Sequence, residues 1–146
     1  MRRHGRQCAL QIIYQMDMQK LLDGQPVDLT VVDNALADFW HSFEPAEPDD
    51  RDFAERLVRG VLAELGPLDE AIAAASRKWR LSRLDRVDHN LLRLAAYEIL
   101  HCPDIPRAAS INEAVEIAKR FCGQDSAAFI NGILDQLGKE ASEPPH

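Results

Sequence analysis

The 146-residue chain lacks the long apolar segment that a membrane protein needs. No run of 18 or more consecutive apolar residues occurs, so we expect no membrane-spanning helix. The opening residues, Met1-Arg2-Arg3-His4-Gly5-Arg6, return to polar side chains too often for the core of a signal peptide. We therefore expect a cytoplasmic protein.

Cysteine is scarce, and its spacing suggests neither a disulfide framework nor a metal site. Cys8, Cys102 and Cys122 include no C-x-x-C pair and fall among apolar positions of expected helices. We interpret them as buried free thiols. The five histidines are likewise scattered without the spacing of zinc ligands, so no metal site is expected.

The sequence also lacks the common catalytic motifs. It contains no glycine-rich dinucleotide or phosphate loop, no nucleophile elbow and no H-E-x-x-H. The adjacent carboxylates Asp49 and Asp50 stand at an expected helix start, where the helix dipole favours negative charge without any acid–base role. We expect no catalytic residues, no cofactor and no enzymatic activity.

Helical periodicity runs through almost the whole chain, whereas alternating strand-like runs are absent. The sequence therefore predicts an all-α fold of about seven helices. We expect a single helical domain over residues 1–139 and a flexible tail over 140–146. The expected helices cover approximately residues 3–22, 29–43, 49–66, 67–79, 82–102, 110–122 and 125–137.

Several residues at expected helix ends have capping chemistry. Asp28 is a predicted N-cap. Ser110-Ile-Asn-Glu113 matches a capping box, in which Ser110 and Glu113 would each accept from the other's backbone N–H. Asp125-Ser126 can cap the last helix. Phe121 belongs to the apolar stripe that follows the capping box. Glu98 falls on another buried stripe, where we expect a structural carboxylate that pairs with an arginine or caps a helix.

The charge of the chain is unevenly distributed. The net charge is −7, yet the first 20 residues hold four basic side chains against the single acid Asp17. Arg2, Arg3 and Arg6 stand at a helix entrance, and arginine binds phosphate bidentately and stacks on bases. These arginines are either ordinary solubilising residues near a terminus or an exposed RNA-contacting tip, and in both cases their replacement should hardly change stability.

A second group of basic residues lies in the middle of the chain. We interpret it as a solvated helix face plus a loop, and as the next candidate for an RNA site. Its members are Arg77, Lys78, Arg80, Arg83, Arg86 and Arg93.

A series of motifs, in order, gives the chain a specific resemblance. The arginine-rich opening runs into Ala9-Leu10-Gln11-Ile12-Ile13-Tyr14, and further motifs follow at 57–61, 69–72, 88–98, 104–106, 111–121 and 125–135. This series resembles the NusB family over residues 2–138. A departure is seen at His4 and Gly5, where many relatives carry a further arginine and an alanine.

The resemblance implies a fold of two small helical bundles and a role in transcription antitermination. It implies binding to the single-stranded boxA RNA of ribosomal RNA leaders and to ribosomal protein S10 (NusE), within an RNA polymerase complex containing other Nus factors. Phe129 would either stack on a base or pack in the core. The implied RNA contacts are Arg2, Arg3, Arg6, Asp125 and Phe129, and the implied S10 contacts are Tyr14 and Asp88.

Two alternative functions remain open at this stage. One is a helical adaptor or homodimer without strong RNA binding. The other is a stand-alone relative of the RNA-binding domain of ribosomal RNA cytosine methyltransferases. Those enzymes need a doubly wound domain with a glycine-rich cofactor turn, for which we expect no room in this chain.

Overall fold

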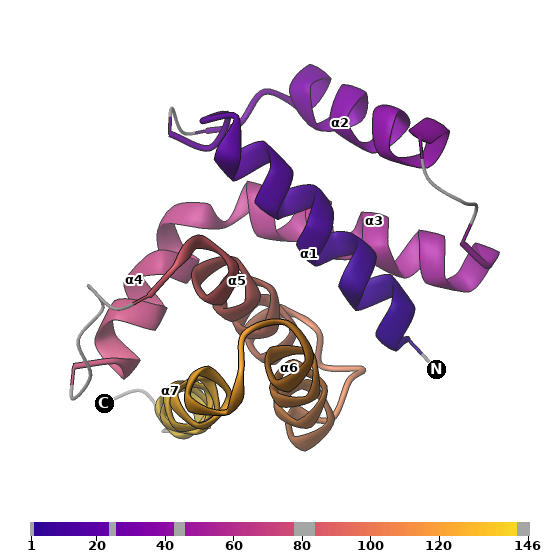
Figure 1. Ribbon diagram of the computed structural model, residues 1–146. Helices are drawn as coiled ribbons and strands as arrows, with labels where there is room; N and C mark the ends of the chain where they lie inside the picture. Colours follow the sequence, from indigo (N-terminus) through magenta and orange to yellow (C-terminus); the bar gives the residue numbers. More distant parts are fainter. Residues whose placement is uncertain (1, 24–25, 43–45, 78–83, 143–146) are drawn as a thin grey trace. The chain divides into compact units, whose positions relative to one another are not determined.

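The computed structural model describes residues 2–23, 26–42, 46–77 and 84–142. Over these ranges the chain forms seven α-helices and no strand, which confirms the all-α prediction (Figure 1). None of these helices is long and apolar enough to cross a membrane. The helices are α1 (Arg3–Met18), α2 (Leu29–Ser42), α3 (Pro48–Ala63), α4 (Leu65–Ala75), α5 (Arg86–His101), α6 (Arg107–Phe121) and α7 (Gln124–Ser142).

The chain divides into two compact units, Met1–Leu65 and Gly66–His146. In the first unit, α1 packs closely on α3 and more loosely on α2. The apolar side chains between these helices are buried, and burying each one stabilises the fold by about 1.5–3 kcal/mol relative to leaving it in water. The buried side chains of this core include Ile12, Ile13, Met16, Leu36, Leu57, Val58 and Val61.

The ends of the first three helices follow local chemistry. The N–H of Thr30 donates to Oδ1 of Asp28 at 2.7 Å, so the predicted cap of α2 is confirmed. Pro48 occupies the first turn of α3 together with Asp49 and Asp50. The first helix is shorter than predicted, because Lys20 adopts a left-handed backbone with φ of 61° and stops it after Met18.

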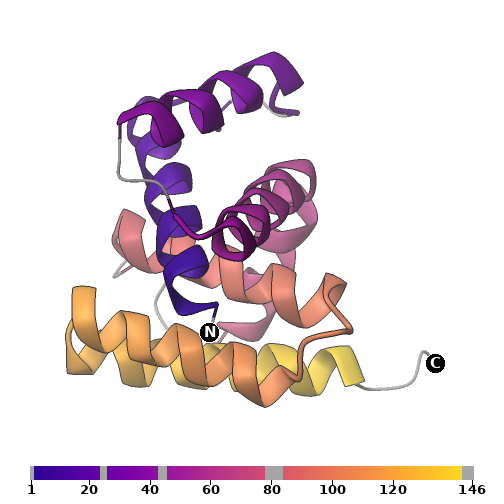
Figure 2. The same cartoon turned by 90° about the vertical axis from the view of Figure 1, so that its right-hand side faces the viewer.

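In the second unit, α5 lies against both α6 and α7, which run side by side (Figure 2). The central α5 is buried around most of its circumference, including Leu91, Leu92 and Leu94. Asp85 is its N-cap, and Oδ1 of Asp85 accepts from the N–H of Asp88 at 2.8 Å. The helix therefore carries the core of this unit.

A partly buried polar network joins α4 to α5. Arg93 donates from Nε and Nη2 to the two carboxylate oxygens of Asp69, both at 2.8 Å, and His89 Nε2 lies 3.0 Å from Oδ1. Asn90, fully buried, accepts from Arg93 and donates to the carbonyl of Arg86. Burial alone would raise the pKa of the Asp69 carboxyl, but the hydrogen bonds and charges of Arg93 and His89 hold it well below its usual range.

The predicted capping box at Ser110 is wrong. Helix α6 already begins at Arg107, after Pro106, so Ser110 lies inside it. The Ser110 hydroxyl is buried and donates to Oε1 of Glu98 on α5 at 2.9 Å. This bond explains the buried carboxylate that the sequence places on the stripe of α5.

The last helix starts earlier and ends later than predicted. Gly123, with φ of 96°, makes the turn that separates α6 from α7. Because α7 begins at Gln124, both Asp125 and Ser126 lie within its first turn and neither is its N-cap. The helix extends through Ser142, so residues 140–142 of the predicted tail are helical, and residues 143–146 lie outside the described residues.

We expect Ser110→Ala to destabilise the second unit by about 1–3 kcal/mol, because a buried carboxylate loses a donor. The free energy of unfolding, measured by urea titration, checks this effect. Glu98→Gln should cost less in the Ser110→Ala background than in the parent chain, since an amide tolerates the loss better. Strictly additive effects of the two changes would contradict the pairing.

We also expect stability to fall in acid because of Asp69. Its folded pKa is lowered, so its contribution is present above the unfolded value of about 3.9 and is lost as the pH falls below it. Asp69→Asn should cost about 2–4 kcal/mol at neutral pH by leaving Arg93 poorly paired. Urea titrations from pH 7 to 3 should show a smaller acid loss in this variant than in Asp135→Asn, an exposed carboxylate paired with Lys139. Equal losses would refute the role of Asp69.

Candidate nucleic-acid interface

The start of α1 approaches the start of α3 at Gly5. A Cβ atom built on Gly5 would lie 2.8 Å from the carbonyl oxygen of Asp50 and 3.2 Å from Cδ2 of Phe53. Real Cβ atoms are not found so close to a backbone oxygen. Glycine therefore permits this close contact between the two helices, and the contact determines where the neighbouring arginines lie.

The aromatic ring of Phe53 on α3 holds two of the three arginines that were predicted to contact RNA. The guanidinium carbon of Arg2 lies 4.5 Å from the ring centroid, and that of Arg6 lies 5.2 Å from it. Phe53 is 4% exposed. Cation–π contacts of this kind contribute about 0.5–2 kcal/mol, depending on exposure. They restrict the orientation of both arginines.

The three arginines are not equally accessible. Arg2 is exposed and Arg3 is half-buried, whereas Arg6 is only 5% exposed. The prediction of a uniformly exposed tip is therefore wrong for Arg6, and replacing this residue removes packing as well as charge. What the sequence does not show is the partner on α3, because Phe53 is 47 residues further along the chain than Arg6.

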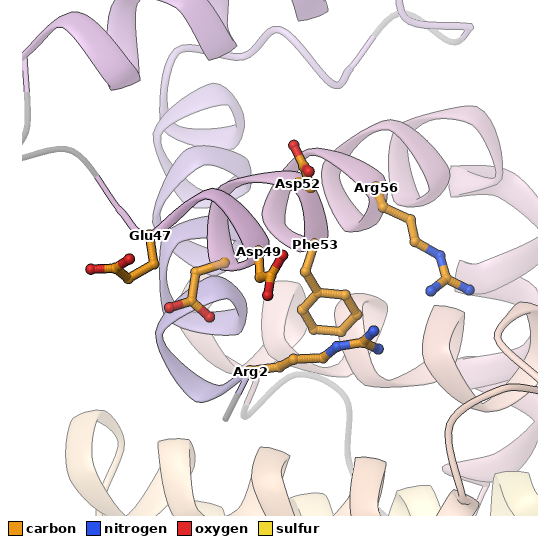
Figure 3. Close-up of a pocket in the computed structure, with 7 residues that line it drawn as sticks. Arg2, Glu47, Asp49, Asp52, Phe53 and Arg56 are labelled. Carbon is orange, nitrogen blue, oxygen red and sulfur yellow. The ribbon is translucent and has the colours of Figure 1, made fainter.

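Arg2 and Phe53 also line an open pocket of about 670 Å³ on the first unit. Figure 3 shows the Arg2 side chain running beneath the Phe53 ring, with its guanidinium group on the side of the ring where Arg56 of α3 lies. Glu47 lies at the opposite end, before α3 begins. The other lining residues are Asp49, Asp50 and Asp52. Positive charge is thus concentrated at one end of an acidic pocket.

The remaining RNA contacts implied by the resemblance lie in the second unit. Asp125 is exposed in the first turn of α7, and Phe129 is half-buried one turn later. The exposed aromatic residue of this region is Phe121 at the end of α6, 59% exposed, although its stripe predicted burial. The periodicity of α6 predicts burial for its whole apolar stripe, so it missed that the ring at the end of the helix is exposed.

The two positions predicted to contact S10 have different environments. Tyr14 is half-buried on α1. Asp88 on α5 is 4% exposed, and its Oδ2 accepts from the Ser126 hydroxyl of α7 at 3.2 Å. Burial raises the pKa of the Asp88 carboxyl, with the nearby Asp85 adding to it, against hydrogen bonds that lower it. The structure therefore places Asp88 inside the second unit rather than on its surface.

Of the three free cysteines, Cys8 and Cys102 are buried and Cys122 is half-buried. Burial raises the pKa of the Cys122 thiol to about 12, and the neighbouring Asp88 carboxylate contributes to this shift. The thiol therefore stays protonated and a poor nucleophile at neutral pH. In the described part of the chain, no group of three or more His, Cys, Asp or Glu side chains is placed to hold a metal ion.

The second basic group is less available for RNA than its sequence suggests. Arg93 is buried against Asp69, and Arg77 is exposed but ion-paired with Glu140 at 3.5 Å. Lys78, Arg80 and Arg83 lie outside the described residues. The interpretation as a solvated face is therefore wrong for Arg93.

Taken together, the fold and the site define an all-helical protein of two compact units with an arginine-rich helix start. The NusB family model matches residues 3–139, and the chain belongs to the NusB family. The transcription antitermination protein NusB of Anaeromyxobacter dehalogenans is 45% identical over 136 residues, covering 93% of this chain and 89% of that protein. NusB of Geobacter sulfurreducens is 44% identical over 136 residues, covering 93% and 92%.

Solved structures of this family share the fold. T. maritima NusB superimposes with a TM-score of 0.78 at 36% sequence identity, covering 96% of this chain and 92% of that one. A structure of antitermination factors NusB and NusE in complex with dsRNA gives a TM-score of 0.78 at 19% identity, covering 95% and 96%. At that identity the second likeness concerns the fold alone.

We expect Gly5→Ala to lower the free energy of unfolding by about 1 kcal/mol. Alanine gains about 1 kcal/mol of helix propensity, but the added methyl group forces α1 away from Asp50 at a cost of about 1–3 kcal/mol. Thermal or urea unfolding measures the net effect, and Ala37→Gly on the exposed face of α2 calibrates the propensity term. A variant more stable than the parent chain would show that the two helix starts are not in close contact.

Proposed function

We propose that this protein is a transcription antitermination factor. In this role it binds boxA-type single-stranded RNA of ribosomal RNA leaders together with ribosomal protein S10 (NusE), and it promotes terminator read-through by RNA polymerase with other Nus factors. The proposal is carried by the arginine-rich start of α1 in a chain that matches the NusB family over residues 3–139. Relatives named as antitermination proteins support it.

The three arginines have different roles in the proposed RNA site: two contact RNA, and one stabilises the start of α1. Arg2 and Arg3 contact backbone phosphates, because Arg2 is exposed and Arg3 is partly so. Arg6, buried against Phe53, keeps the helix start in place. Guanidinium groups suit this task since they donate bidentate hydrogen bonds to phosphate oxygens.

Base contacts are proposed for the second unit. Phe121 is the better stacking residue than Phe129, because 59% of its surface is exposed while Phe129 is half-buried. The carboxylate of Asp125 repels phosphate, so its proposed role is to accept hydrogen bonds from base amino groups or from a ribose 2′-OH. These contacts carry sequence selectivity, whereas the arginines carry affinity.

The partner contact is proposed at Tyr14, with Asp88 acting from inside the second unit by fixing the start of α7 through Ser126. We propose no catalytic role and no cofactor for this chain. S10 extends the RNA-binding surface, and a second surface on the same RNA raises affinity without a second association cost.

The decisive experiment is the salt dependence of RNA binding. Two phosphate contacts, from Arg2 and Arg3, give a slope of log K against log salt of about −1.4, from roughly −0.7 for each contact to a single strand. In the Arg2→Gln/Arg3→Gln variant the slope should become less steep by about 1.4, and affinity for a labelled boxA-type RNA should fall. Arg6 is left in place, because its replacement also disturbs packing.

The matched control removes two charges elsewhere. Arg59→Gln/Lys139→Gln breaks two exposed ion pairs, with Asp33 and Asp135, and should leave the slope and the melting temperature almost unchanged. If the tip variant binds RNA with the slope of the parent chain, the start of α1 is not the RNA site.

A further inference from the structure

Arg56 of α3 shares the open pocket of the first unit with Arg2. The residue stands three positions after Phe53 on the same helix, so the two side chains project from the same face, one turn apart. Arg56 is exposed. Figure 3 shows the guanidinium groups of Arg56 and Arg2 on the same side of the Phe53 ring, away from Glu47.

We propose that Arg56 is a further RNA-backbone contact, which adds a second guanidinium group to that of Arg2 at this pocket. The inference rests on the proposed function, because it takes the start of α1 as the place where RNA binds. It extends the phosphate-binding surface from α1 onto α3. The ligand chemistry is that of a single-stranded nucleic-acid backbone, with consecutive phosphates meeting consecutive arginines.

The arrangement favours an anion between the two arginines. Two guanidinium groups at one end of a pocket can both donate hydrogen bonds to the oxygens of one phosphate, which a single arginine cannot do as strongly. The Phe53 ring fixes the position of Arg2 in advance, which lowers the entropic cost of binding. Arg56 is anchored on the rigid middle of α3, so it needs no loop rearrangement to take part.

The carboxylates that line the same pocket limit where an anion binds. Asp49 and Asp50 occupy the first turn of α3, where the helix dipole favours negatively charged side chains. Figure 3 shows Glu47 at the far end and Asp52 pointing away from the Arg2 side chain. An anion should therefore bind at the end of the pocket where Arg56 lies, in direct contact with this residue.

The test compares two arginines on one helix. Arg56→Gln and Arg59→Gln each remove one exposed charge from α3, but Arg59 does not line the pocket. In the full-length protein, Arg56→Gln should weaken binding to a labelled boxA-type single-stranded RNA by roughly three- to tenfold and reduce the salt slope by about 0.7. Arg59→Gln should change affinity by less than about twofold.

Two further variants make the result specific. Arg56→Lys keeps the charge but loses the bidentate geometry, so it should bind with intermediate affinity and an unchanged salt slope. Arg2→Gln tests the proposed function separately, because Arg2 belongs to the RNA site whether or not Arg56 does. Thermal melts of the two Arg56 variants should match that of the parent chain, since Arg56 is exposed. Arg2→Gln also loses the cation–π contact with Phe53, so its melting temperature should be slightly lower.

The outcomes separate the two proposals. If Arg2→Gln weakens binding and Arg56→Gln does not, the role of Arg56 is wrong and the proposed function stands. If neither variant changes RNA binding, the site of the proposed function is wrong as well. If Arg59→Gln weakens binding as much as Arg56→Gln, the loss reflects the general charge of α3, and the contact at Arg56 is overturned.

Discussion

The contact of Phe53 with the start of α1 is the constraint on which the basic tip depends. The ring is almost completely buried, and two guanidinium groups, from Arg2 and Arg6, lie against it. This arrangement requires α1 and α3 to approach closely, and that approach is permitted by the missing side chain at Gly5. The same contact therefore fixes the helix packing and the direction in which Arg2 presents its charge.

A comparable constraint organises the second unit around α5. Arg93 is buried, so its charge has to be satisfied inside the protein, and Asp69 provides two charge-assisted hydrogen bonds for it. Glu98 is satisfied in a similar way by Ser110. These polar bonds connect α5 with α4 and α6, and each needs its two partners at matching positions along the helices.

Much of the fold could be predicted from the sequence because its helices have clear periodicity and local stop signals. Asp28 caps α2 as predicted, since an N-cap depends only on residues within one turn. Ser110 shows where local reasoning fails. Its spacing to Glu113 fits a capping box, but the helix already begins at Arg107, and the hydroxyl bonds instead to a carboxylate 12 residues earlier.

The candidate site was predictable in composition but not in geometry. The arginine-rich opening is evident in the sequence, whereas the burial of Arg6 depends on Phe53, a residue on another helix. The exposure of Phe121 has the same origin: its place on the stripe of α6 is apolar, but it stands at the end of the helix. Periodicity identifies the face of a residue, and only the tertiary structure shows whether that face is covered there.

The acidity of the chain has a consequence for selectivity. With a net charge of −7, most of the surface repels nucleic acid, and only local arginine geometry offsets this repulsion. The repulsion between exposed charges is screened beyond about 8–10 Å at physiological salt, whereas a direct contact between arginine and phosphate is screened less. Carboxylates that line the same pocket as Arg2 are too close to a bound strand for salt to screen them fully, so the direct contacts with arginine have to outweigh their repulsion. In the proposed RNA complex the arginines therefore supply the phosphate contacts, and contacts with bases and with the bound partner add to their affinity.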